Sequence, residues 1–307
     1  MRQPSSHGWE PADVPQRPVL FVNPLSGSGK AARAEVTDRA RERGIEIVVL
    51  TSDRDLAALV REAVARGTDA LGVAGGDGSL AAVAAAASAH GLPFACVPVG
   101  TRNHFARDLG IDRRDPVGAL DAFSDGVERR IDIGEVNGRT FLNNVTLGIY
   151  GDAVRRPSYR GAKVRTLLET ADEVLGPSGA VPELRLVDDL GREHTHPVVV
   201  LVSNNPYALD PPAPLGTRLT LDIGRLGIIV LDAPRFGRRP RGRVWSTPRL
   251  EMDAAALLHA GIDGEAVDLT PPLEFVIRPA ALRVRISSRH PGVPPPGRPP
   301  LPGPATA

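Results

Sequence analysis

The sequence predicts an α/β N-terminal lobe with a parallel sheet, followed by a C-terminal β-sandwich lobe. Up to about residue 132, short apolar runs alternate with alanine-rich and charge-rich segments of helical length, as they do in βαβ units. Beyond that point, strand-like runs follow one another with glycine, aspartate or proline between them. That second pattern is typical of an antiparallel sandwich.

The N-terminal elements follow from apolar runs that end at turn residues. Four runs read as buried strands, at residues 17–24, 45–50, 70–75 and 93–100. Helical segments separate them, at 30–43, 53–67 and from the glycine-rich turn after residue 75 to His90. Gly44 is placed to end the first helix in the left-handed conformation. Strands and helices in this order form a twisted parallel sheet covered on both faces.

The C-terminal elements are mostly strands. Strand-like runs lie at 139–148, 182–205, 217–233, 250–269 and 273–287, and only residues 160–175 look clearly helical. The expected domains are a disordered segment at 1–16, the α/β domain at 17–132, the sandwich at 133–288 and a disordered proline-rich tail at 289–307. The last strand of the sandwich could return to the first lobe, and the P-x-x-P spacings of the tail could dock on a partner.

Composition excludes several classes of protein. The 37 basic and 36 acidic side chains leave a net charge of +1, so no global field attracts nucleic acid. The single cysteine, Cys96, excludes an intrachain disulfide and reads as a buried strand thiol. Residues 1–16 lack the pattern of a signal peptide, and no apolar run is long enough to span a membrane. We therefore expect a cytoplasmic chain, with peripheral contact at the inner face of the membrane as an alternative.

A glycine-rich turn, "GGDGS" at 75–79, follows the third predicted strand. Its glycines allow phosphate oxygens to approach the main chain closely. Asp77 would repel a bare phosphate unless a divalent cation lies between them or the carboxylate takes a proton. Such a turn alone is more often only a turn, but "NPLSGSGK" (23–30) and "PVGTRNHFA" (98–106) also follow strands. Because the carboxyl ends of parallel strands share one edge, the three loops indicate a nucleotide site.

Two common phosphate-binding motifs are excluded. A P-loop needs a glycine where Pro24 stands and a hydroxyl where Ala31 stands. The dinucleotide fingerprint tolerates Ala32 at its third glycine, but no ribose-binding acid follows the second strand, where the chain reads Leu-Thr-Ser at 50–52.

The motifs resemble a known family. "VNPLSGSGKA", "GGDGSL", "PVGTRNHFARDLGI", "DIGEVNGRTFLNNVTLGIYGDAV" and "AGIDGEAV" have the order and spacing of the diacylglycerol kinase catalytic-domain superfamily, bacterial lipid kinases that also resemble sphingosine kinases. The resemblance runs from Arg17 to Ser288. "GGDGS" alone is shared with NAD kinases and phosphofructokinases, but together with the later "IDGE" it is specific.

The resemblance implies an ATP-dependent and Mg²⁺-dependent lipid kinase with a cleft between a nucleotide-binding lobe and a lipid-substrate lobe. Diacylglycerol is the default substrate, and the activity would belong to phospholipid biosynthesis. The implied nucleotide site comprises Asn23, Ser26, Gly27, Gly75, Gly76, Asp77, Gly78, Ser79, Thr101 and Asn103. Asp77 and Asp132 are the implied magnesium residues, and Glu265 would face the lipid hydroxyl as general base. Asp263 would orient the same site, with Asp77 as a competing base.

Each of these acids also has a purely structural interpretation. Asp132 could cap a turn, and Asp263-Gly264 could form an Asp-Gly hairpin with Glu265 solvated. Asn143 and Asn144 could equally form a structural turn or part of the site.

The sequence departs from the family at two places. His104 stands where the family usually has aspartate, and "IGRLG" at 223–227 replaces a D-G-x-L-D segment that is associated with a structural magnesium. Asp222 is one residue out of register, which in a strand reverses its face. We therefore expect the catalytic metal and not the structural one.

An arginine-rich segment at 235–245, flanked by Phe236 and Trp245, is a candidate contact with anionic headgroups. A solvated surface loop is the alternative. Nothing in the pattern decides the oligomeric state, so an oligomer remains open.

Two other functions compete with the lipid kinase. An NAD kinase would share "GGDGS", but the chain has "GTRN" and "IDGE" and lacks an evident "NNE" motif after the glycine loop. A catalytically silent regulator that binds lipid or nucleotide is favoured by His104 and "IGRLG", whereas the intact Asp77 and Glu265 oppose it.

Overall fold

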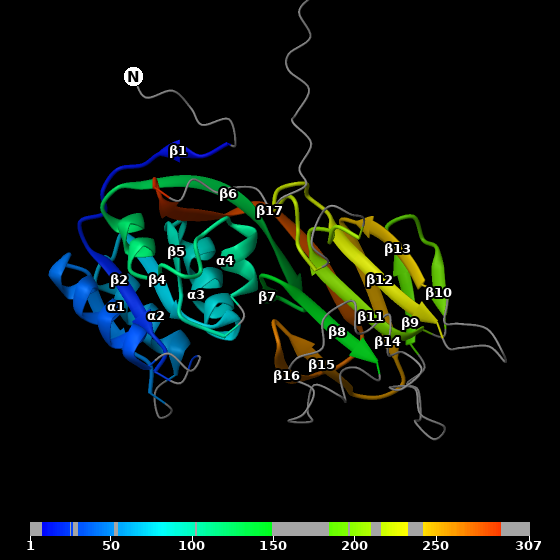
Figure 1. Cartoon of the computed structure of the whole chain (residues 1–307). Coiled ribbons are helices and arrows are strands. Elements are labelled where there is room, and N and C mark those ends of the chain that lie inside the picture. Colours follow the sequence, from blue (N-terminus) through cyan, green and yellow to red (C-terminus); the bar gives the residue numbers. More distant parts are fainter. Residues whose placement is uncertain are drawn as a thin grey trace, which may run out of the picture.

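The computed structural model describes residues 8–24, 26, 30–51, 55–101, 103–148, 184–195, 197–209, 216–232 and 242–289. Within them, the chain forms a mixed sheet that contains parallel strands and a second sheet that is antiparallel throughout. Figure 1 shows the two parts side by side, with the helices gathered around the parallel strands and two long strands running from one part into the other.

The N-terminal part is built on four parallel strands in the order β3-β2-β4-β5. Their bounds are β2 Pro18–Val22, β3 Glu46–Val49, β4 Ala70–Gly75 and β5 Phe94–Pro98. The helices between and after them are α1 Lys30–Glu42, α2 Leu56–Ala65, α3 Asp77–His90 and α4 His104–Asp108. Strands β2, β4 and β5 are buried along their whole length, which explains why their sequences are continuously apolar.

Local signals set the helix ends in this part. Asp55 caps α2, because its carboxylate accepts hydrogen bonds from the N–H groups of Ala57 and Ala58. Helix α3 ends at Gly91, which adopts the left-handed conformation with φ 64°. The thiol of Cys96 is buried in β5, as expected, and this burial raises its pKa.

Two long strands connect the parts. Strand β6, Gly126–Val136, pairs antiparallel with β17, Leu273–Ser287, along almost its whole length. One end of β17 pairs parallel with β5, and the other end pairs antiparallel with β14, Arg249–Ala254. The boundary expected near residue 132 therefore falls inside a strand, because the first sheet is continuous through both parts.

The second sheet has six strands in the order β13-β12-β11-β8-β15-β16. Their bounds are β8 Asn144–Gly148, β11 Pro197–Asn204, β12 Leu226–Asp232, β13 Gly242–Thr247, β15 Leu258–Ile262 and β16 Glu265–Leu269. The first sheet adds β7 Arg139–Phe141, β9 Leu184–Asp188 and β10 Glu193–Thr195. A second core cluster draws residues from both sheets, including Phe141, Leu250 and Phe275 from the first and Val145, Val200 and Ile228 from the second. A 3₁₀ helix, Gly118–Phe123, packs against β5 and β17.

The N-terminal segment requires a correction. Residues 1–16 were expected to be disordered, but from Gly8 onward the chain is ordered. Trp9 is 3% exposed and belongs to the first core cluster, and β1, Glu10–Pro11, pairs with β6. Burial of one tryptophan removes a large apolar area from water, which offsets the entropy lost on ordering a short segment. Residues 1–7, the predicted helix at 160–175 and the tail from 290 lie outside the described residues.

A second correction concerns the strand predicted at 217–233. Only Leu226–Asp232 forms a strand, and the preceding segment is irregular. Its N–H groups bind side chains instead of a neighbouring strand: Ile223 donates to Asn205 Oδ1 at 3.0 Å, and Gly224 donates to Asp132 Oδ2 at 2.7 Å. A backbone satisfied in this way has no need of a sheet ladder.

Candidate active site

The three predicted loops meet at the carboxyl edge of the parallel strands. The N–H of Gly76 donates to Ser26 Oγ at 3.1 Å, and Asn23 Nδ2 donates to Ser79 Oγ at 2.7 Å. The third loop packs on the second so closely that a Cβ at Gly100 would lie 2.7 Å from the Gly76 Cα. Only glycine fits there, because the atom it would displace belongs to the backbone.

The third loop is held by its own asparagine. Asn103 has φ 50°, and its side chain both accepts from the Gly100 N–H at 3.0 Å and donates to the Gly100 carbonyl at 2.9 Å. Asparagine is one of the few residues that tolerate this left-handed conformation. Thr101 is exposed beside it, and Gly27 lies outside the described residues. Gly75 ends strand β4, where an added Cβ would lie 3.2 Å from the Ser79 Cβ.

Asp77 stands where two helices begin. It is the first residue of α3, and its carboxylate accepts long hydrogen bonds from the N–H groups of His104 at 3.5 Å and Phe105 at 3.4 Å at the start of α4. A carboxylate offers about four lone-pair sites. These two long contacts therefore leave Asp77 with capacity to bind a cation.

Glu265 comes from the other part of the molecule and faces the glycine loop. It follows a hairpin turn in which Asp263 has φ 49° and Gly264 has φ 89°, the two positive values of a type I′ turn. A Cβ placed on Gly78 would lie 1.9 Å from Glu265 Oε1, so the carboxylate occupies the space that the glycine leaves open. Asp263-Gly264 therefore forms the hairpin turn that the structural interpretation expected, and the Glu265 carboxylate after it reaches the glycine loop.

Asp263 is buried behind that turn. Its carboxylate accepts three backbone hydrogen bonds, from Leu142 N at 2.8 Å, Asn143 N at 2.7 Å and Asn144 N at 3.0 Å. The pKa of Asp263 is raised to about 7, mainly by burial and in smaller part by the nearby Asp77, while the three backbone N–H groups oppose the shift. Asp263 thus holds the 142–144 turn and the Glu265 hairpin together.

Asp132, expected beside the magnesium, has different partners. It is 1% exposed, and its two carboxylate oxygens accept hydrogen bonds from Gly224 N at 2.7 Å and Ala280 N at 2.9 Å. Neither of these partners belongs to the glycine loop that carries Asp77. These contacts agree with the structural interpretation of Asp132, because each oxygen holds one segment: the irregular 222–224 segment by one and the bulge of β17 by the other.

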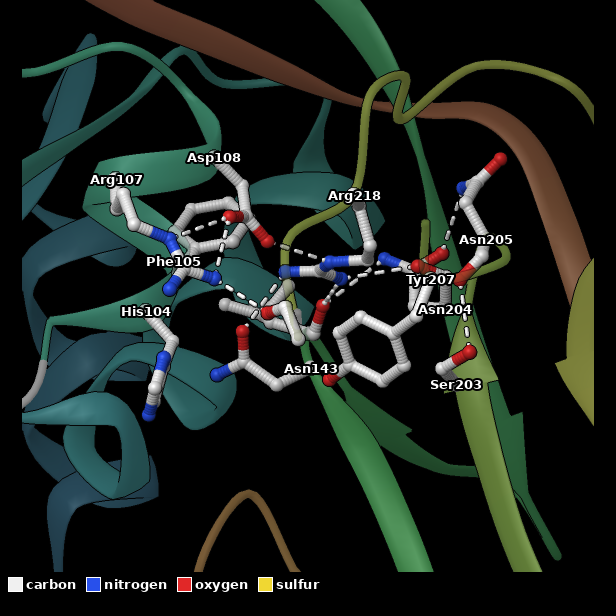
Figure 2. A network of polar contacts seen from close by, with 12 residues as sticks. His104, Phe105, Arg107, Asp108, Asn143, Ser203, Asn204, Asn205, Tyr207 and Arg218 are labelled. Carbon is white, nitrogen blue, oxygen red and sulfur yellow. Dashed lines mark hydrogen bonds and ion pairs between the residues drawn. The ribbon is translucent and has the colours of Figure 1, made fainter. Parts of the chain in front are cut away.

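A buried ion pair that crosses between the two parts was not predicted from the sequence. Arg218 Nε donates to Asp108 Oδ2 at 2.7 Å, and both side chains are at most 1% exposed. The other guanidinium nitrogens donate to the Leu142 carbonyl, the Asn204 carbonyl and Asn143 Oδ1 (Figure 2). Arg218 also lies over the ring of Tyr207, with its Cζ 5.9 Å from the centroid. The one signal in the sequence was an arginine within the uncharged segment "TRLTL", and the usual pattern predicts such an arginine to be exposed.

The ends of the arginine-rich segment also need a correction. Arg243 and Trp245 lie in strand β13, not in a loop. Arg243 pairs with Asp232 and contacts His194 Nδ1 at 2.8 Å, and Trp245 stacks on the His194 ring with centroids 4.5 Å apart. These two partly exposed residues are engaged with other side chains of the fold, and residues 233–241 lie outside the described part of the chain.

Comparison with known proteins agrees with this architecture. The model of the diacylglycerol kinase catalytic domain matches residues 17–136. The diacylglycerol kinase of Mycobacterium tuberculosis is 36% identical over 122 residues, which are 38% of this chain and 40% of that protein. A Pseudomonas aeruginosa protein named "Probable lipid kinase YegS-like" is 32% identical over 89% of this chain and 95% of its own length. The chain belongs to the diacylglycerol kinase catalytic-domain family.

Solved structures of this family share the fold. A crystal structure of a diacylglycerol kinase from Bacillus anthracis superimposes with a TM-score of 0.64 at 17% sequence identity and covers 91% of this chain and 99% of that chain. Among the helices in the described ranges, none is long and apolar enough to cross a membrane. The same residues contain no cluster of three or more histidine, cysteine, aspartate or glutamate side chains that could hold a metal ion by themselves.

Proposed function

We propose that this protein is a lipid kinase that transfers the γ-phosphate of ATP to the hydroxyl of a membrane lipid, with diacylglycerol as the first substrate to test. The observation that carries the proposal is the position of Glu265. Its carboxylate comes from the second sheet and lies against Gly78, in the loop where the nucleotide phosphates would bind. Family membership supports the reaction class but leaves the lipid open.

The residues at this edge can do the work that phosphoryl transfer asks of a protein. The transfer is largely a matter of positioning the phosphates and stabilising charge, with a nearby group to accept the proton of the attacking hydroxyl. Glu265 is the residue to accept that proton as the lipid oxygen bonds to the γ-phosphorus and the bond to ADP breaks. The backbone of the "GGDGS" loop, at the start of α3, is suited to bind the phosphates.

The site fits a magnesium ion that arrives with the nucleotide. Magnesium is usually held by one or two carboxylates together with substrate phosphates and waters, not by a cage of protein ligands. Asp77 is the carboxylate in position to hold it, which agrees with the lack of a larger acidic cluster in the described residues. When bound, the ion would neutralise charge that develops on the phosphate oxygens.

The direct test is phosphate transfer from radiolabelled ATP with Mg²⁺ to a panel of acceptors. The panel contains diacylglycerol, a monoacylglycerol, a sphingoid base and NAD, each in mixed micelles or in solution. We expect a labelled lipid that disappears on removal of Mg²⁺. Labelled NADP with no labelled lipid would identify an NAD kinase, and no labelled acceptor despite measurable ATP binding would favour the silent regulator.

We also propose that the arginine-rich segment brings the enzyme to an anionic membrane surface. Each basic residue near such a surface contributes about 1 kcal/mol of binding. Replacement of Arg235, Arg238, Arg239 and Arg241 with serine should lower sedimentation with phosphatidylglycerol vesicles and make it less sensitive to salt. Activity on a soluble short-chain substrate should not change. Unchanged vesicle binding would instead favour the alternative, a solvated surface loop.

A further inference from the structure

Every backbone N–H and carbonyl group of the 142–144 turn forms a hydrogen bond. Asp263 accepts from the three N–H groups of the turn, and its own N–H donates to the Asn144 carbonyl at 2.9 Å. The Leu142 carbonyl accepts from Arg218 and from Asn204 Nδ2, and the Asn143 carbonyl accepts from Asn204 N at 3.0 Å. A turn with this many fixed hydrogen bonds has one conformation, so the side chains it carries are pre-positioned.

Arg218 sets the orientation of the Asn143 amide. A guanidinium only donates hydrogen bonds, so the Asn143 atom 2.8 Å from Arg218 Nη2 is the carbonyl oxygen. The amide nitrogen, with two N–H donors, must then point the opposite way. Figure 2 shows it turned away from Arg218, toward the side on which His104 begins α4.

Three independent contacts place the 142–144 turn, which carries this nitrogen, beside the glycine loop. Helix α4 is five residues long, so Asp108 at its end, which binds Arg218, lies only about 6 Å along the axis from its beginning, where Asp77 caps the helix. Helix α3, which begins in the glycine loop, contacts strand β7, which leads into the turn. Asp263 ties the turn to the hairpin of Glu265, whose carboxylate lies against Gly78.

We propose that Asn143 is a substrate-contacting residue, whose amide N–H₂, oriented by Arg218 in its buried pair with Asp108, donates a hydrogen bond to the γ-phosphate of the bound nucleotide. The proposal rests on the proposed function for the identity of the ligand. Arg218 is a positioning residue in it, because its donors are used by Asp108 and by the turn, and none is assigned to the phosphate. An N–H donor fixed before the substrate arrives stabilises charge without reorganisation during transfer.

The variant Asn143→Asp tests the proposal without removing the packing. The new carboxylate has the same shape, and one oxygen still accepts from Arg218, but the other presents negative charge where the donor was. The matched control is Asn144→Asp. Asn144 Nδ2 donates to the Tyr207 hydroxyl at 2.8 Å, and that hydroxyl can donate to a carboxylate instead.

Binding of MgATP and MgADP is measured by calorimetry, alongside thermal unfolding. Loss of a hydrogen bond to a charged group, with repulsion in its place, should weaken MgATP binding by at least about 10-fold in Asn143→Asp. MgADP lacks the γ-phosphate, so its affinity should change by less than about 3-fold, and Asn144→Asp should change neither affinity. Turnover of Asn143→Asp should fall about 100-fold, the usual effect of removing one donor to a developing oxyanion.

The outcomes separate the two proposals. Equal loss of MgATP and MgADP affinity, or no loss of either, overturns the role of Asn143 and leaves the kinase proposal standing if the wild type labels a lipid. Selective loss of MgATP affinity supports Asn143 even if the wild type labels none of the lipids tested, which would overturn the choice of acceptor alone. A wild type that binds no MgATP overturns both proposals.

Discussion

The two sides of the candidate site are built in opposite ways. On the side of the parallel sheet, backbone glycines and a few short contacts bring three loops together, and Asp77, Thr101 and His104 remain wholly or partly accessible to solvent. On the other side, the 142–144 turn lies on a buried polar network around Arg218 and Asp263 in which nearly every partner is another protein group. The accessible side therefore offers loop groups to the nucleotide, whereas the buried side uses its rigidity to hold two side chains, Glu265 and Asn143, toward the same ligand.

The largest expected effect is the loss of turnover on substitution of Glu265, the exposed acid that the buried side holds over the glycine loop. Glu265→Gln keeps the size of the side chain but removes its basicity, so turnover should fall by about 10²-fold to 10⁴-fold, the usual contribution of a positioned base. Affinity for MgATP should stay near wild type, because the change acts on proton transfer. The control is Glu251→Gln, an exposed residue of β14 that pairs with Arg249. A normal rate of lipid phosphorylation in Glu265→Gln would transfer the role of base to Asp77.

Substitutions on the buried side should lower the free energy of unfolding. Arg218→Met leaves the buried Asp108 with only the partly exposed Arg107 as an ionic partner, and it removes the donors to the Leu142 and Asn204 carbonyls. We expect the free energy of unfolding to fall by about 3 kcal/mol, the lower end of the loss from breaking a buried pair. The double variant with Asp108→Asn should recover part of that loss, because the buried carboxylate that has lost one of its two arginine partners is then neutral. Chemical denaturation measures both variants.

An exposed arginine provides the matched comparison. Arg249 pairs with Glu251 and Glu274 at 3.0 Å each, but all three side chains are more than half exposed. Arg249→Met should therefore cost no more than about 1 kcal/mol. A similar loss from both methionine variants would mean that the Arg218 network contributes no more than a surface pair, and the contrast between the two sides would fail.

The pH dependence of stability should separate the two sides as well. Burial raises the pKa of Asp263 from 3.8 to about 7, so the folded state favours its neutral form. The stability that this group contributes is fully present below about pH 4 and is lost as the pH rises through about 7. Relative to Asp263→Asn, which cannot titrate there, wild type should lose up to about 4 kcal/mol between pH 4 and pH 8. A stability difference that is flat over this range would show that the carboxylate is ionised in the fold throughout.

The smallest expected effect is at the loop contacts of the accessible side. Asn23→Asp replaces the donor to Ser79 Oγ with an acceptor, and the hydroxyl can turn to donate to it. Stability should change by less than about 1 kcal/mol, because the hydrogen bond reverses instead of breaking. MgATP affinity should fall more than stability, because a negative charge is added beside the phosphate loops. Equal affinity for MgATP in both proteins would place Asn23 outside the nucleotide site.

Local signals predicted much of the N-terminal part. Continuous apolar runs predicted β2, β4 and β5, and Gly44 and Gly91 mark the ends of their helices, both with positive φ. The three loops could be expected to meet because parallel strands present their carboxyl ends at one edge. The Asp-Gly turn before Glu265 could also be predicted from local sequence, because both residues adopt positive φ more easily than most others.

The errors arose where a residue depends on distant neighbours. The magnesium role of Asp132 stays a prediction, and the local pattern did not show that its two oxygens accept from the N–H groups of Gly224 and Ala280. Residues 217–225 were read as strand, although the N–H groups of Ile223 and Gly224 bind side chains from other segments. Trp9 was placed in a disordered segment because the surface that buries it comes from elsewhere in the chain.

By itself, the sequence determined the order of strands and helices in the N-terminal part, the glycine loops and the acids that belong to the family's motifs. These depend on backbone preferences and on spacings of a few residues, which any stretch of the chain carries locally. Only the tertiary structure decided that Arg218 is buried against Asp108, 110 residues away, and that Glu265 fills the space over Gly78. Burying a charge is unfavourable unless its partner is already in place, and which partner that will be is known only when both parts of the chain have folded together.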